Sequence, residues 1–269
     1  VLSKSYIKVM TTKSGVIKTK YEKKKLHRSS VDQALLKKEW KRFSSSTIYL
    51  LNTGLGTLFL IVGIIAMLVK GSEVKPLILE LFGDVEQYIA LIICVAECFI
   101  VSTNGVSAPS ISLEGKTLWQ LQVLPISKMQ VLNAKLKLHV LVSAPAVVLF
   151  GIVTGNVLSL DGLSTALLIL IPSILVIICG ELGLVFNLLN PRLDYETESA
   201  AVKQSLSVLL TLFTGYALIS VFIGLFVLVM DKWAVELYLG MVLGLEIIIG
   251  ILLYQWLRTK GCKILETLG

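Results

Sequence analysis

Six long apolar stretches, separated by polar connections, dominate the pattern of the chain. Most contain the roughly 20 apolar residues that a helix needs to cross a bilayer. None alternates apolar and polar positions as the strands of a membrane barrel do. The pattern therefore predicts an all-α fold, a polytopic membrane helical bundle with six transmembrane helices across residues 48–257. These spans are expected at about 48–69, 87–108, 138–156, 164–189, 205–230 and 237–257.

Two different polar segments precede the first span. Residues 1–30 hold nine of the 25 Lys and Arg residues and show no apolar period, which predicts a basic cytosolic segment or linker. Residues 31–47 place Leu36, Trp40 and Phe43 on one helix face and basic residues on the other. This arrangement predicts an N-terminal amphipathic interfacial helix, with its apolar face among lipid headgroups and its basic face in water.

The positive charge is distributed very unevenly about the predicted bundle. If the N-terminus is inside, all of the 25 Lys and Arg residues lie on the inner side except Lys70, Lys75 and Lys232. The positive-inside rule then predicts that both termini are cytosolic, with residues 258–269 as a cytosolic tail. Loops beside a membrane explain the net charge of +7, so the lipid bilayer is an expected partner and nucleic acid is not.

Composition supports a membrane protein and gives little sign of an enzyme. The chain is 55% hydrophobic and only 16% charged, whereas a soluble domain would carry roughly 25% charged residues. The four cysteines lack metal-ligand spacing, and we interpret them as small apolar residues plus one reduced cytosolic thiol. His27 and His139 are isolated from any nucleophile or metal partner. No catalytic residue and no metal ligand is predicted.

The most structured polar stretch is the loop Ser112–Lys137, between the second and third spans. Leu118 and Leu121 share a face with Trp119 beside them, which predicts a short amphipathic helix that ends at Pro125. Ser127, followed three residues later by Gln130, matches a capping box that begins a helix running into the third span. The loop is either a lever that a partner moves or an ordinary connector. The residues expected to contact a partner are Glu114, Gly115, Lys116, Leu118, Trp119, Leu121, Pro125, Ser127 and Gln130.

The same loop contains the sequence Gly115-Lys116-Thr117, which matches the end of a phosphate-binding loop. The complete pattern requires a glycine five residues before Gly115, where this chain has Ser110. We therefore predict no nucleotide site and no cofactor bound by this chain. Any ATP would be handled by another polypeptide.

Three carboxylates fall inside predicted spans: Glu97, Glu181 and Glu246. An acid within a membrane is costly and tends to face the interior of the bundle. One interpretation is a pathway for protons or cations. The other is that the acids are protonated, hydrogen-bonded within the bundle, or face a cavity without titrating.

These features together resemble the permease subunit of a bacterial ABC-type exporter, of the type-2 ABC permease family. The resemblance rests on the helix KKEWKRF, six spans with an inside N-terminus, the loop SLEGKTLWQLQVLPISKMQVLNAK and the turn NPRLD after the fourth span. It covers residues 31–257 and is to the second six-span half of a longer permease. Because the chain begins with Val1, we expect the latter part of a longer polypeptide, with a half-size subunit as the alternative.

The resemblance implies a function and a set of partners. The central loop would be a coupling helix seated on a separate ABC ATPase subunit that holds ATP and Mg, in the bacterial plasma membrane. A second permease half or a homodimer mate would complete the pathway. Two alternatives stay open: a proton-coupled secondary transporter that uses the three intramembrane carboxylates, and a non-transporting membrane anchor protein.

Overall fold

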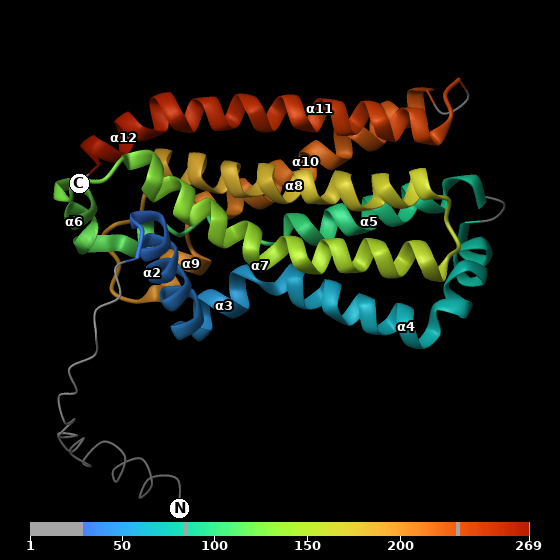
Figure 1. The fold of residues 1–269 in the computed structure, drawn as a ribbon, viewed down its shortest axis with the longest axis horizontal. Coiled ribbons are helices and arrows are strands. Elements are labelled where there is room, and N and C mark those ends of the chain that lie inside the picture. The colour runs from blue at the N-terminus through green and yellow to red at the C-terminus, as the bar shows by residue number, and fades with distance from the viewer. Residues whose placement is uncertain (1–28, 83–85, 230–231, 269) are drawn as a thin grey trace, which may run out of the picture.

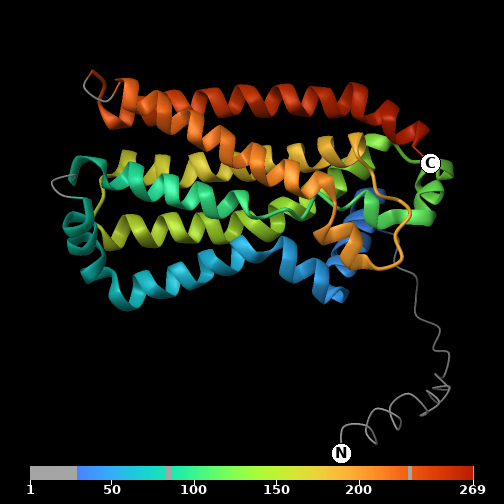
Figure 2. The same ribbon diagram turned by 180° about the vertical axis from the view of Figure 1, so that it is seen from behind.

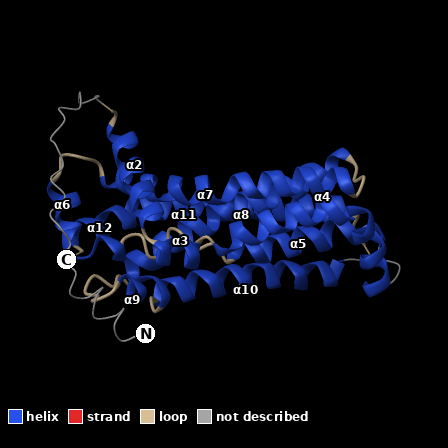
Figure 3. Ribbon diagram, turned by 90° about the horizontal axis from the view of Figure 1, so that it is seen from below, coloured by secondary structure: helices blue, strands red, loops and turns tan. Residues whose placement is uncertain are grey.

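The computed structural model describes residues 29–82, 86–229 and 232–268. These residues form a bundle of helices and contain no strand (Figures 1 and 3). Five helices are long and apolar enough to cross a membrane, which is the architecture of a multi-pass membrane protein. They are α4 (Leu55–Phe82), α7 (Lys128–Val157), α8 (Gly162–Leu189), α10 (Leu206–Val229) and α11 (Val235–Trp256). Of the predicted basic segment 1–30, all but the last two residues lie outside the described ranges.

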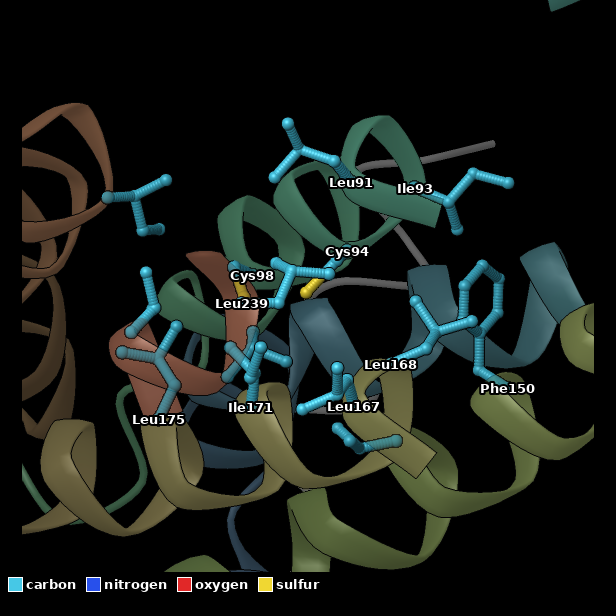
Figure 4. Close-up of a cluster of buried hydrophobic side chains, with 14 of the residues drawn as sticks. Leu91, Ile93, Cys94, Cys98, Phe150, Leu167, Leu168, Ile171, Leu175 and Leu239 are labelled. Atoms are coloured by element: carbon cyan, nitrogen blue, oxygen red, sulfur yellow. The ribbon is translucent and has the colours of Figure 1, made fainter. Parts of the chain in front are cut away.

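Helix α8 is the centre of the bundle. It contacts α5, α7, α10 and α11, and two thirds of its most apolar window is buried. Its neighbours α10 and α11 leave most of their apolar side chains on the outside, as expected of helices that face lipid. A cluster of buried side chains from α5, α7, α8 and α11 packs around α8 (Figure 4).

The first predicted span begins with a short separate helix, α3 (Thr47–Thr53), and continues in α4 after a break at Gly54. Helical geometry fails again at Lys70, close to the predicted end of the span at residue 69. Beyond this kink α4 continues to Phe82, in a stretch that the hydrophobic pattern assigned to a loop.

The second predicted span, 87–108, is wrong in its extent. Its apolar helix, α5 (Ile89–Ser102), has only 14 residues and rises about 21 Å at 1.5 Å per residue, less than the roughly 30 Å of a hydrocarbon core. From Thr103 to Ile111 the chain runs in turns, yet nearly every residue there is buried. Figure 2 shows this connection as a green trace that runs from α5 toward α6. Thus five long helices are present and the count of six crossings stays a prediction.

The polar connections gather at one end of the bundle, which we call the α6 end. It carries α2 (Val31–Ser45), η2 (Ser112–Thr117), α6 (Leu118–Val123), α9 (Glu198–Lys203) and α12 (Cys262–Thr267) (Figure 1). The C-terminal residues, predicted as a tail, instead continue α11 through a π-helical turn, η3 (Leu257–Gly261), into α12. Leu257 and Leu265 are buried against the bundle, which explains why this segment is helical.

Candidate functional site

Helix α6 presents an apolar surface to solvent and buries its other face. Leu118 and Leu121 are almost completely buried, whereas Trp119 is 58% exposed and Val123 is 69% exposed. Leu124 follows in an extended conformation and is half exposed. We call Trp119, Val123 and Leu124 the α6 surface. Their exposure at the tip of the α6 end makes them the candidate contact for a partner, because three neighbouring large apolar side chains gain free energy when covered.

The buried face of α6 is fastened to the rest of the α6 end. Leu118 and Leu121 belong to a cluster with side chains of α7, α8 and α12. The side-chain amide of Gln122 donates to the carbonyl oxygens of Leu265 at 3.1 Å and Leu268 at 2.5 Å. Lys128, in the first turn of α7, donates to the carbonyl oxygen of Gln122 at 2.8 Å. The α6 helix is therefore held between α7 and the C-terminal helix rather than extended on a free loop.

The start of α7 carries the capping box that the sequence indicates. The side-chain oxygen of Gln130 accepts a hydrogen bond from the backbone N–H of Ser127 at 3.1 Å. Pro125 and Ser127 are exposed, and Pro125 lies in the short link between α6 and α7. This link is only four residues long, Leu124–Ser127, so a displacement of α6 acts directly on the first turn of α7.

A buried ion cluster joins η2 to α2 and α7, and the sequence did not predict it. Lys135, on α7, has no exposed side-chain surface. Its ammonium group donates to Glu39 Oε1 at 2.9 Å, to Glu114 Oε1 at 2.8 Å and to the carbonyl oxygen of Ser110 at 2.9 Å. All three donors of the ammonium are thereby matched, which is the condition for burying such a charge at tolerable cost.

Glu114 is the centre of this cluster, and only 1% of its side chain is exposed, which leaves almost no surface for its predicted contact with a partner. Its second oxygen, Oε2, accepts from Lys38 at 2.9 Å and from Arg42 at 2.8 Å. Burial alone would raise the pKa of the Glu114 carboxyl, but the charges of Lys135, Arg42 and Lys38 hold this pKa well below its usual range. The carboxylate is ionised at neutral pH and joins the loop to α2 and α7.

Helix α2 turns Leu35, Glu39 and Phe43 toward the bundle. Of the predicted apolar stripe, Phe43 lies on this face, whereas Leu36 is half-buried and Trp40 is 48% exposed. The contact of the stripe with lipid headgroups stays a prediction. The apolar period gave no sign that Glu39 is buried, because this burial depends on an ion pair with Lys135, which is distant in the sequence.

Gly115 and the loop after α8 complete the packing around η2. Gly115 adopts φ +51°, a conformation that side chains other than glycine rarely adopt. A Cβ there would lie 3.3 Å from the ring of Tyr195, whose hydroxyl donates to the carbonyl oxygen of Leu113 at 3.1 Å. The backbone conformation at this position therefore requires glycine. Gly115 and Lys116 were both expected to contact a partner, and of the two only Lys116 is exposed.

Asn187 is one of several side chains that hold the buried connection 103–111. Asn187, on α8, is fully buried, and its side-chain oxygen accepts from the backbone N–H groups of Ile111 at 2.7 Å and Ser112 at 3.0 Å. Its amide donates to the hydroxyls of Ser112 at 2.7 Å and Ser207 at 3.2 Å. Non-helical backbone at this depth is tolerated only where protein groups satisfy its hydrogen bonds.

The three intramembrane acids lie on three different helices, α5, α8 and α11, and all are buried. Glu97 is 0% exposed, Glu181 2% and Glu246 1%. Both carboxylate oxygens of Glu97, and Oε2 of each of the other two, have no hydrogen-bond partner in the described part of the chain. Glu246 lines a cavity between helices, whereas the other two do not. The interpretation in which they are hydrogen-bonded to neighbouring side chains therefore finds no support.

No protein-family model, no curated protein and no solved structure matches the chain. The description of the site therefore rests on its own geometry.

Proposed function

We propose that this chain is the transmembrane permease subunit of an ATP-driven ABC exporter in the cell membrane. In this proposal α5 with its buried connection forms the sixth crossing, beside the five long helices. The α6 end is cytosolic, in keeping with the distribution of positive charge, and α2 lies in the headgroup plane. ATP and Mg are bound by a separate ABC ATPase subunit, and a second permease half or a homodimer mate completes the pathway.

The observation that carries this proposal is the α6 surface on its rigid base. Exposed Trp119, Val123 and Leu124 offer an ATPase a contact, while the face beneath them is bound to the bundle. Because the link to α7 is short and Glu114 ties η2 to α2 and α7 through ion pairs, motion of α6 would be passed on to the helices. Closure of the ATPase on ATP would then tilt α7 and open an outward path.

Replacing Trp119 with alanine tests the contact. We expect Trp119→Ala to weaken association with the ATPase by about 2 kcal/mol or more, because buried aromatic anchors dominate such interfaces. The bundle should stay folded, since Trp119 packs mainly outward. Co-purification of the ATPase with the tagged chain measures the effect. Trp40→Ala is the matched control, because Trp40 is similarly exposed at the same end but lies on α2. Full association and transport in Trp119→Ala would leave the loop as a connector and return the anchor protein to consideration.

Removing the capping box should leave binding of the ATPase intact while it weakens the coupling of ATP hydrolysis to transport. We expect the double variant Ser127→Ala with Gln130→Ala to bind the ATPase normally but to hydrolyse ATP with reduced transport, because the first turn of α7 then absorbs the motion of α6. The ratio of substrate exported to ATP hydrolysed, measured in proteoliposomes, reports this. An unchanged ratio would show that the capping box has no part in coupling.

Cysteine labelling tests the orientation. In a Cys262→Ser background the other native cysteines are buried, so a thiol introduced at an exposed position gives the signal. We expect a membrane-impermeant maleimide to reach Ser72→Cys from outside the cell and Thr117→Cys only after the membrane is opened. Both native residues are exposed. Labelling of Thr117→Cys from outside would overturn the orientation and the coupling role together.

A proton-coupled secondary transporter is the second candidate, and Glu97 is the observation in its favour. A buried carboxyl without a partner is expensive inside a membrane and is often functional. If the exporter proposal holds, Glu97→Gln should keep transport within about two-fold, and ATP-dependent transport should survive collapse of the proton gradient. Transport into proteoliposomes, with and without a protonophore, distinguishes the two. Loss of transport in the Glu97→Gln variant, together with loss of transport by the unchanged chain when the protonophore is added, would favour the secondary transporter.

A further inference from the structure

An apolar cavity of about 230 Å³ lies between α5, α8, α10 and α11. Its walls include Leu91, Cys94 and Cys98 from α5, and Ile171 from α8, which Figure 4 shows gathered with Leu239 of α11. The cavity is partly open to the outside of the bundle. An apolar cavity of about 150 Å³ is known to take up benzene, so this one has room for a benzene ring with several further carbon atoms.

One wall of the cavity departs from this apolar lining. Glu246, on α11, is the one acidic residue among the lining residues and is 1% exposed. Its Oε2 has no hydrogen-bond partner among the described residues, and none of the ion pairs found in those residues includes it. A buried carboxylate needs a compensating charge or hydrogen-bond donor. The protein leaves this need unmet beside a space of ligand size.

We propose that this cavity binds a small hydrophobic organic cation, with its apolar body among the residues of α5, α10 and α11 and its ammonium group against the carboxylate of Glu246. Aromatic side chains favour the same class of ligand, because Phe222, Phe226 and Tyr238 also line the cavity and a quaternary ammonium is attracted to aromatic faces. The cavity lies beside α10 and α11, whose outer faces are exposed and apolar, as suits a ligand that enters from the bilayer. Because the bound cation would be the substrate that the permease exports, this assignment rests on the proposed function.

Equilibrium dialysis of the purified, detergent-solubilised chain tests the proposal directly. The probe is radiolabelled benzyltrimethylammonium, and the competitor is neopentylbenzene, its neutral carbon isostere with nearly the same shape. We expect saturable binding at one site per chain, with the isostere competing at least ten-fold more weakly. Absence of saturable binding, or equal competition by the neutral isostere, would overturn the assignment of a cation site.

Three variants locate the site. Glu246→Gln should lower affinity for the cation at least ten-fold, and it is expected to fold because it replaces a buried carboxyl that lacks a partner with a neutral amide of the same shape. Val242→Phe should also lower affinity by filling the cavity while it leaves the acid in place. Glu181→Gln, which changes a buried acid that does not line the cavity, should bind the cation within two-fold of the unchanged chain. Binding that survives both Glu246→Gln and Val242→Phe places the site elsewhere and contradicts the proposal.

The two proposals fail separately in these experiments. Cation binding is measured without ATP or an ATPase, whereas the exporter proposal is tested by ATPase association through Trp119. A chain that binds its ATPase but not the cation keeps the permease role and loses this substrate class. A chain that binds the cation but no ATPase keeps the cavity site and loses the exporter.

Discussion

Glu114→Gln is expected to destabilise the folded chain by about 3–5 kcal/mol, the cost of removing one partner from a buried ion cluster. Without this carboxylate the fully buried ammonium of Lys135 retains only Glu39 and one carbonyl oxygen, and Arg42 loses its 2.8 Å ion pair. Denaturation by SDS, followed by circular dichroism in detergent, measures the free energy of unfolding. Glu196→Gln is the matched control, because Glu196 is exposed in the neighbouring loop and should change stability by less than about 0.5 kcal/mol.

The stabilisation of the folded chain by Glu114 should also weaken as pH falls. Its folded-state pKa is lowered from the ordinary value of 4.5, so the unfolded chain takes up a proton first as pH falls. The stabilisation by Glu114 is therefore fully present above pH 4.5 and is lost progressively below it. The difference in unfolding free energy between the unchanged chain and Glu114→Gln should shrink as pH falls below 4.5. A difference that stays constant down to low pH would contradict the ionised cluster.

Asn187→Leu is expected to lower the free energy of unfolding by a similar amount. It leaves the backbone N–H groups of Ile111 and Ser112 buried without their acceptor, at about 1–3 kcal/mol for each donor. Asn156→Leu is the control, because Asn156 is exposed and its amide bonds only a carbonyl of its own helix. The same SDS denaturation gives both values. Equal stability of the two variants would mean that the connection 103–111 is held by other contacts.

The sequence predicts the features of this fold that depend on neighbouring residues. The long apolar stretches around α7, α8, α10 and α11 are local properties of composition, and the start of α7 follows from a capping box three residues apart. The shared face of Leu118 and Leu121 follows likewise from the period of a short amphipathic helix. The period did not indicate that this face packs against the chain itself, and both residues were expected to contact a partner, whereas both are buried.

What the sequence does not reveal depends on partners far away along the chain. Lys135 meets Glu39 across a separation of 96 residues, and no local pattern pairs them. Hydropathy continued the second span through residues 103–108 because Val106 and Ala108 are apolar, although the hydrogen bonds of a non-helical backbone decide the structure there. The polar Asn187 near the end of apolar α8, and the residues Asn104, Gly105 and Pro109 within the connection itself, were signals that the hydropathy average passed over.

The connection 103–111 has a consequence for the order in which the protein is made. This segment leaves the ribosome well before α8 and α10, which carry Asn187 and Ser207, two of the side chains that form hydrogen bonds with it. Until then the segment lacks part of its hydrogen bonds, although α3, made earlier, already offers Tyr49 to the carbonyl oxygen of Val106 and the carbonyl oxygen of Thr53 to the N–H of Gly105. Its unpaired peptide groups are more stable in water or at the membrane surface than in lipid. We therefore expect the segment to reach its final buried position only after α8 and α10 have joined the bundle, which makes its burial a late step of folding.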